Sequence, residues 1–190
     1  MLALVRPAVL LFLALSVVTG LAYPAAVGLA SRLLFPAQAS GSVIVRGETA
    51  VGSRLIGQNF TGAKYFWGRP SATSPQPYNG VGSNGSNLGP RNPALADAVR
   101  ARIEALHRAD PQNRLPVPVD LVTASASGLD PHIGVAAARY QAGRIARERG
   151  LPLPAVLALV ETHVEGRQWG LFGEARVNVL ELNLTLDTLR

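Results

Sequence analysis

The sequence contains no cysteine among its 190 residues, and this absence removes several kinds of chemistry. Disulfide bonds, thiol catalysis and thiolate metal sites are all excluded. Histidine is scarce as well, because His107, His132 and His163 are the only three, and no two of them have ligand spacing on one predicted helix. We therefore expect no metal site and no cofactor bound by the chain itself.

Lysine is almost absent too: Lys64 is the only one, and the other 17 of the 18 basic residues are arginine. The formal net charge is +6, but no run of adjacent basic residues with interleaved aromatic residues occurs. Such a run is the usual footprint of a nucleic-acid-binding surface. We therefore expect no nucleic-acid partner.

The motifs of phosphate binding and of nucleophilic catalysis are weak or missing. No Walker-type phosphate loop occurs, and Gly80 and Gly82 lie in a loop of irregular glycines that is a weak signal for nucleotide binding. The Gly-x-Ser-x-Gly sequence that exposes a serine between a strand and a helix is also absent. These absences argue against a chain with catalytic machinery of its own.

Charge is missing from a long N-terminal segment. From Pro7 to Ser31 no residue is charged, and this length exceeds the roughly 20 apolar residues that cross a bilayer core. Pro24 lies inside the segment and is expected to kink the helix, which membrane helices tolerate. We predict that residues 1–35 form a single transmembrane anchor.

A cleaved signal peptide is the competing interpretation of the same segment. Arg6 would then be the basic n-region, and Ala37-Gln38-Ala39 would be the cleavage site. However, the apolar stretch is about twice the length of an ordinary h-region of roughly 7–15 residues. The length therefore favours an uncleaved anchor.

The rest of the chain has the pattern of one mixed α/β domain. Residues 36–42 form a polar linker, and residues 43–190 form a soluble domain with a small sheet and three main helices. Strands are expected at 43–45, 53–58, 120–125 and 177–182, and a long loop rich in Gly, Pro, Ser and Asn is expected from 68 to 93.

Helix starts carry clear local signals. Asn92 and Asp130 each precede a proline, so each is expected to be the N-cap of a helix, and Gly150 is expected to end the second one. The stripe of Leu95, Val99, Ile103 and Leu106 should be buried on the first helix, and Val135, Ala138, Ala142 and Ile145 on the second. A third helix is expected near 154–164, and Asn183 is expected to cap a short final turn.

Two polar groups of residues are candidate sites. Ser127, Asp130 and His132 resemble the members of a hydrolytic triad, which gives an alternative function as a membrane-anchored extracytoplasmic hydrolase. Gln141, Arg144 and Glu148 share one stripe of the second helix. That stripe is either a solvated face with an i,i+4 ion pair or a contact surface for a partner or a nucleotide, with Gln141 and Arg144 as the contacting residues.

Several sequence blocks together carry a specific resemblance to a known family. They cover nearly the whole chain and are Gly-Ser-Arg-Leu-Ile-Gly-Gln at 52–58, Tyr-Phe-Trp-Gly-Arg-Pro-Ser-Ala at 65–72, Gly-Ser-Asn-Leu-Gly-Pro at 85–90, Pro-Val-Asp-Leu-Val-Thr at 118–123, Ser-Gly-Leu-Asp-Pro-His at 127–132, Tyr-Gln-x-x-Arg at 140–144 and Arg-Val-Asn-Val-Leu-Glu-Leu-Asn at 176–183. In these blocks the chain resembles the C subunit of the Kdp potassium-transporting P-type ATPase. One departure is Ala126, where glycine is expected.

The resemblance implies a complex in the inner membrane. Its partners would be a potassium-binding A subunit, an ATP-hydrolysing B subunit and a small F peptide, and any ATP would be bound through the B subunit complex. The C subunit of this family is described as an assembly factor and as a catalytic chaperone that raises the B subunit's affinity for ATP. The N-terminal segment of this chain resembles an uncleaved signal sequence, so we expect a single-pass protein whose soluble domain is extracytoplasmic.

Overall fold

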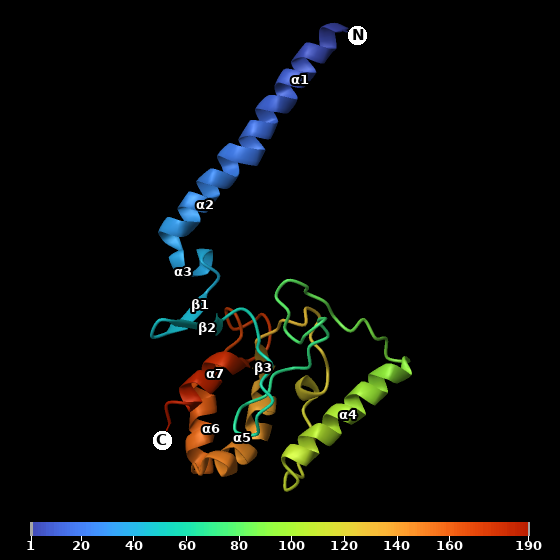
Figure 1. Cartoon of the computed structure of the whole chain (residues 1–190), viewed down its shortest axis with the longest axis vertical. Helices are drawn as coiled ribbons and strands as arrows, with labels where there is room; N and C mark the ends of the chain where they lie inside the picture. Colours follow the sequence, from blue (N-terminus) through green and yellow to red (C-terminus); the bar gives the residue numbers. More distant parts are fainter. Residues whose placement is uncertain (1, 190) are drawn as a thin grey trace. The chain divides into compact units, whose positions relative to one another are not determined.

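The computed structural model describes residues 2–189 and divides into two compact units, one ending at Val51 and the other beginning at Gly52. The first unit begins with a long, nearly continuous helix that consists of α1 (Leu2–Val17), the π-helical turn η1 (Val18–Ala22) and α2 (Tyr23–Leu34) (Figure 1). From Ala3 to Leu34 this helix is long and apolar enough to cross a membrane. The predicted apolar helix is therefore confirmed.

The π turn has a local cause in Pro24. Proline has no N–H and its ring crowds the carbonyl four residues earlier, so the ordinary α-helical hydrogen bonds cannot run through this position unchanged. The chain widens to a π turn directly before α2, and Thr19 Oγ1 donates to the carbonyl of Leu15 at 2.8 Å. The disturbance that Pro24 predicts is accommodated inside one helix.

A short helix and a hairpin follow the long helix. Helix α3 (Pro36–Ala39) leads into β1 (Val43–Arg46), and β1 pairs with β2 (Thr49–Ser53), whose last two residues belong to the second unit. Gly47 has a φ of +60° in the turn between the strands, which suits glycine. The expected strand at 43–45 is confirmed, whereas the one expected at 53–58 is wrong, because the chain leaves the sheet at Ser53.

The second unit is built from helices around a three-stranded antiparallel sheet. Its elements are α4 (Pro93–Ala109), the 3₁₀ turn η2 (Val119–Leu121), β3 (His132–Gly134), α5 (Val135–Arg149), α6 (Leu153–Thr162), β4 (Val164–Glu165), β5 (Arg176–Asn178) and α7 (Val179–Leu186). The strand order is β3-β5-β4, with Val177 of β5 opposite Ile133 on one side and Val164 on the other. The mixed α/β class is confirmed, and α7 adds a short helix to the three expected ones.

The core lies between the sheet and helices α5, α6 and α7. Ile133, Ile145, Val156, Val177 and Leu182 are at most 1% exposed. Ala138 and Ala142 of the predicted α5 ridge are both fully buried, and α5 packs against α6. Helix α4 contributes less, because only Leu106 of its predicted stripe is fully buried.

Four further expectations for the second unit are wrong. Residues 120–125 form η2 and a turn instead of a strand. Residues 177–182 begin as β5 but continue as α7, which places Asn183 inside that helix instead of at its start. Helix α5 begins at Val135 because His132–Gly134 pairs with β5, so Asp130 is not its N-cap. Asn92, by contrast, caps α4 as predicted and accepts a hydrogen bond from Ala94 N.

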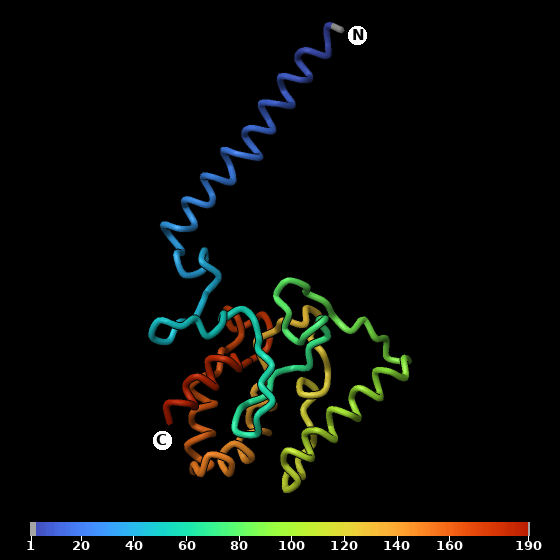
Figure 2. Tube along the Cα trace, viewed as in Figure 1, coloured from blue at the N-terminus to red at the C-terminus, as the bar shows by residue number. Residues whose placement is uncertain are grey.

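The segment from Arg54 to Asn92 contains no regular element, in agreement with the long loop expected at 68–93 (Figure 2). It is fixed by hydrogen bonds of its own side chains and backbone. Ser71 Oγ donates to Gly128 O at 2.7 Å, Tyr78 Oη donates to Arg69 O at 2.6 Å, and Asn84 N donates to Ser127 O at 2.9 Å. Burial raises the pKa of Tyr78 to about 12, so this donor keeps its proton at physiological pH. The loop is thereby an ordered layer on the body of the unit.

Candidate functional site

Gln141 and Arg144, the two candidate contact residues, lie on the inner side of α5. They are 1% and 3% exposed, whereas Glu148 is exposed. The interpretation of this stripe as a solvated face is therefore wrong for Gln141 and Arg144. Helix periodicity located the apolar ridge correctly, but it could not show that an irregular segment near Trp67 covers the neighbouring polar stripe.

The Gln141 amide pairs with the backbone of Trp67 as a neighbouring strand would. Trp67 N donates to Oε1 at 2.8 Å, and Nε2 donates back to Trp67 O at 3.0 Å. Nε2 also donates to Ala137 O at 3.3 Å, and Oε1 also accepts from Arg144 Nη2 at 2.8 Å. These four bonds use the full donor and acceptor capacity of a side-chain amide.

Asn183 on α7 binds the preceding residue in the same way. Phe66 N donates to Asn183 Oδ1 at 2.9 Å, and Asn183 Nδ2 donates to Phe66 O at 2.9 Å. Helices α5 and α7 therefore each hold the backbone N–H and C=O of one of two consecutive residues. Sequence reasoning missed this role for Asn183, since nothing local in the sequence distinguishes an amide that caps a helix from one that binds a distant backbone.

The Arg144 guanidinium completes the arrangement. It donates to the carbonyl oxygens of Ala63 and Tyr65, and it lies 4.6 Å from the centroid of the Trp67 ring. Arg102 of α4 lies 5.2 Å from the same centroid and donates to the carbonyls of Leu121 and Gly68. Burial lowers the pKa of Arg144 to about 10, which still leaves the group cationic at neutral pH.

We call this group the Trp67 cluster, which consists of Phe66, Trp67, Arg102, Gln141, Arg144 and Asn183. It connects α4 and α5 to the irregular segment through charge-assisted hydrogen bonds and two cation–π contacts, and it connects α7 through the Asn183 amide. A nucleotide or a partner that contacted Gln141 or Arg144 directly would have to replace these bonds. As it stands, the arrangement positions backbone and leaves neither side chain pointing into open space.

The fold brings two of the three triad candidates, Asp130 and His132, together. Ser127 Oγ accepts a hydrogen bond from Leu129 N at 3.1 Å, while His132 faces two carboxylates, Asp130 at 3.5 Å and Glu165 at 3.7 Å. Within residues 2–189 no hydrogen bond joins Ser127 to His132. A nucleophile needs its base within hydrogen-bond reach, and Ser127 Oγ is bonded to Leu129 N instead of to His132.

Asp130 belongs to a turn and an ionic network instead. Its Oδ1 accepts from His132 N at 3.0 Å, and its Oδ2 lies 3.6 Å from Arg69 Nη1. Burial by itself would raise the pKa of Asp130, but the hydrogen bonds from His132 and the nearby Arg69 outweigh it and lower the pKa. The carboxylate thus closes the turn that leads into β3.

Glu165, which sequence reasoning did not single out, is the centre of the same network. It accepts from Arg54 at 2.9 Å and from Arg176 at 3.1 Å, and Arg54 also reaches Glu181 at 3.1 Å. Burial would raise the pKa of Glu165, and the hydrogen bonds from Arg176 and Arg54 lower it instead. Among the residues that the structure describes, no group of three or more His, Asp or Glu side chains is arranged to hold a metal ion.

Comparison with known proteins gives a consistent family. The chain matches, over residues 5–188, the family model described as KdpC, the K+-transporting ATPase c chain. It is 66% identical to the potassium-transporting ATPase KdpC subunit of Variovorax paradoxus (strain S110) over 183 residues, which cover 96% of this chain and 95% of that protein. The corresponding subunit of Dechloromonas aromatica (strain RCB) is 63% identical over 187 residues, which cover 98% of this chain and 97% of that protein.

Proposed function

Because the chain belongs to the KdpC family of K+-transporting ATPase subunits, we propose that it is a non-catalytic subunit that stabilises assembly of the pump and raises the affinity of the ATP-hydrolysing B subunit for ATP. The other partners are the A subunit and the F peptide that the family resemblance implies. The observation that carries the non-catalytic role is the engagement of every candidate catalytic or nucleotide-binding side chain in internal contacts.

Coupling through assembly explains an effect on ATP affinity without a nucleotide site in this chain. A subunit changes another subunit's affinity when it binds one of that subunit's conformations better than the other. The Trp67 cluster supports such a role, because it joins α4, α5 and α7 to the same two residues. A partner that binds one of these helices would therefore act on all three. Gln141 and Arg144 then act through the backbone that they position.

The proposal is tested by comparing the pump with and without this chain. We expect the purified chain alone to hydrolyse no ATP, and the complex lacking it to require more ATP for half-maximal, potassium-stimulated ATPase activity or to lose subunits on purification. ATP turnover by the chain alone would contradict the non-catalytic role. Unchanged ATP dependence and unchanged subunit composition without the chain would contradict the chaperone and assembly roles.

We also propose that α1, η1 and α2 anchor the chain in the inner membrane with the folded unit on the extracytoplasmic side. The scarcity of lysine makes the side easy to test, because Lys64 is the only lysine and is exposed. In right-side-out membrane vesicles, a membrane-impermeant amine reagent should acylate the wild-type chain at Lys64 and should label a Lys64→Arg variant far less. Labelling of Lys64 only in inverted vesicles would place the folded unit in the cytoplasm.

A further inference from the structure

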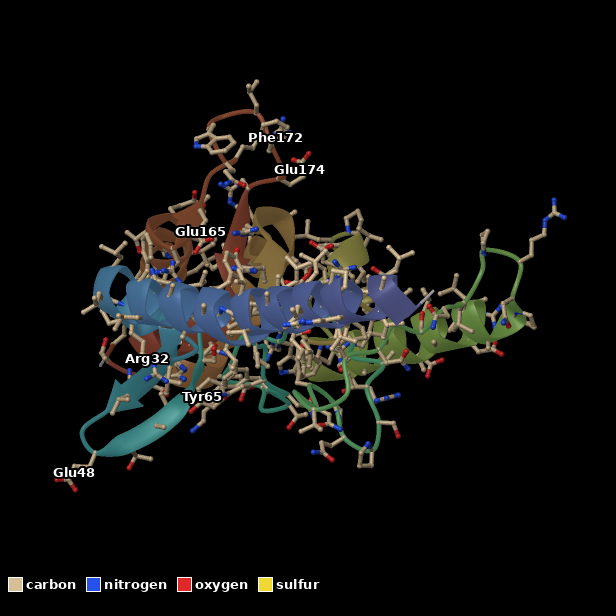
Figure 3. All side chains as sticks on the ribbon, turned by 90° about the horizontal axis from the view of Figure 1, so that it is seen from above. Arg32, Glu48, Tyr65, Glu165, Phe172 and Glu174 are labelled. Atoms are coloured by element: carbon tan, nitrogen blue, oxygen red, sulfur yellow. The ribbon has the colours of Figure 1, made fainter. Side chains whose placement is uncertain are left out.

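The loop between β4 and β5 exposes three large apolar side chains at its tip. We call residues 167–174 the Trp169 loop. Trp169 is 81% exposed, Leu171 75% and Phe172 61%. The rings of Trp169 and Phe172 pack edge to face, with their centroids 6.0 Å apart. In Figure 3 the loop stands out from the rest of its unit, with the labelled Phe172 close to the tip and Glu174 closer to the base. Such a cluster on a folded unit indicates an interaction site.

The loop is preformed. Gln168 N donates to Phe172 O at 2.9 Å, Phe172 N donates to Gln168 O at 3.0 Å, and Arg167 forms two hydrogen bonds of 2.9 Å with Glu174 across the base. Trp169 itself has a φ of +52°, a conformation that non-glycine residues adopt at an energetic cost. The internal bonds therefore hold the loop in this conformation despite the strain at Trp169, and little ordering remains for a binding event to supply.

The chemistry of the tip suits a lipid interface. No residue from Gln168 to Gly173 is charged, and the two flanking charges pair with each other. The N–H groups of Gln168, Gly170, Leu171 and Phe172 all donate within the loop, so moving the tip out of water leaves few backbone donors unpaired. Tryptophan is the residue type enriched at the boundary between headgroups and hydrocarbon.

The apolar helix would hold the folded unit beside the bilayer. The segment from Phe35 to Val51 joins that helix to the folded unit and includes α3, β1 and the first part of β2. A folded unit of this size has a radius of gyration of about 14 Å. This short connection keeps the bilayer at a high effective concentration for the folded unit.

We propose that the Trp169 loop is an interfacial membrane contact that inserts Trp169, Leu171 and Phe172 into the headgroup boundary of the bilayer that anchors the chain. The loop would thereby fix the orientation of the folded unit on the membrane. This inference rests on the anchoring proposed above. A groove on another pump subunit is the competing occupant, and the experiment separates the two.

The test uses the two tryptophans of the full chain. Trp67 is 8% exposed and belongs to the core, so the difference between wild type and Trp169→Phe isolates the fluorescence of Trp169. The chain is reconstituted into phosphatidylcholine–phosphatidylglycerol vesicles with and without brominated acyl chains. We expect brominated lipid to quench most of the Trp169 signal while leaving Trp67 largely unquenched.

Matched variants link the quenching to the tip. Replacing Leu171 and Phe172 together by serine should restore most of the Trp169 fluorescence. Val81→Ser, which removes an apolar side chain that is 98% exposed on another loop, should leave the quenching unchanged. Equal quenching in all three proteins would overturn the proposal, because the signal would then not depend on insertion of the tip.

The remaining outcomes distinguish failure of this proposal from failure of the proposed membrane anchoring. If the chain does not float with the vesicles, the anchor fails and the proposal fails with it. If the chain floats but Trp169 is not quenched by brominated lipid and stays accessible to acrylamide, only the proposal is overturned. Protection of Trp169 from acrylamide solely in the presence of the other pump subunits, without quenching by lipid, would assign the tip to a protein partner and would also overturn it.

Discussion

A side-chain amide presents one donor face and one acceptor face, so it can take the place of a peptide group in a neighbouring strand. Gln141 and Asn183 use this property on the consecutive residues Trp67 and Phe66, and both amides are 1% exposed. Buried backbone groups that lose their partners are costly, so the two amides contribute more to stability than their small contact area suggests. At the residue scale, the candidate site is therefore a structural clamp.

The clamp predicts a large effect for Gln141→Leu. This variant leaves the N–H and C=O of Trp67 unpaired, at about 1–3 kcal/mol for each group. Chemical denaturation of the full chain in nanodiscs should show that loss of unfolding free energy. Glu148→Gln, an exposed change on the same helix, should stay within about 0.5 kcal/mol of wild type. Equal effects of the two variants would show that the clamp does not stabilise the fold.

A second residue-scale prediction follows from Glu165. Folding lowers the pKa of Glu165 below the ordinary glutamate value of about 4.3. The ionised carboxylate therefore stabilises the folded state, and this contribution is lost as the pH falls through the folded pKa. Glu165→Gln should therefore melt at a lower temperature than wild type near neutral pH. The difference should shrink as the pH falls through the lowered folded pKa of Glu165, and a difference independent of pH would contradict the assignment.

The elements of the second unit show which structural features a sequence determines locally. The start of α4 was predictable because Asn92 and Pro93 act on adjacent backbone, and the ridge of α5 was predictable because its apolar spacing is regular. The start of α5 was not predictable, because pairing of Ile133 with Val177 moves it by four positions, from Pro131 to Val135. The run at 120–125 was ambiguous for a similar reason: a short apolar stretch fits a strand or a turn until its neighbours are known.

The two asparagine caps provide a prediction at this scale. The Asn92 side chain is exposed, and its Oδ1 accepts a hydrogen bond from Ala94 N at 3.0 Å. Asn178 is 2% exposed; its Oδ1 accepts from Glu181 N at 3.1 Å, and its Nδ2 donates to Arg54 O at 2.8 Å. Asn92→Asp should be nearly neutral, because aspartate is an equally good N-cap. Asn178→Asp should lower the unfolding free energy by about 1–3 kcal/mol, because it removes the donor to Arg54 O.

Denaturation of both variants under one condition tests the pair. If Asn178→Asp were as harmless as Asn92→Asp, the bond to Arg54 would contribute nothing to the attachment of α7. If Asn92→Asp were the more harmful change, the assignment of Asn92 as a simple cap would be wrong.

At the scale of the whole molecule, the sequence was sufficient for the apolar helix, the mixed α/β class and the family, since each depends on patterns spread over many residues. It was not sufficient for the burial of Gln141 and Arg144, which depends on a segment some 75 to 80 positions away in the chain folding over α5. The same long-range contact changes the role that we infer for these two residues. They now support an account in which the chain influences the pump through its shape and its contacts, without a nucleotide site of its own.

The most direct test of that account is a calorimetric titration of ATP into the full wild-type chain in nanodiscs, free of other subunits. The account predicts no saturable heat at micromolar ATP, because the amide of Gln141 and the guanidinium of Arg144 are already bonded to each other and to the backbone of Ala63, Tyr65 and Trp67. The B subunit, titrated in the same way, serves as the positive control. Saturable micromolar binding to the chain alone, competed by a non-hydrolysable ATP analogue, would contradict the account.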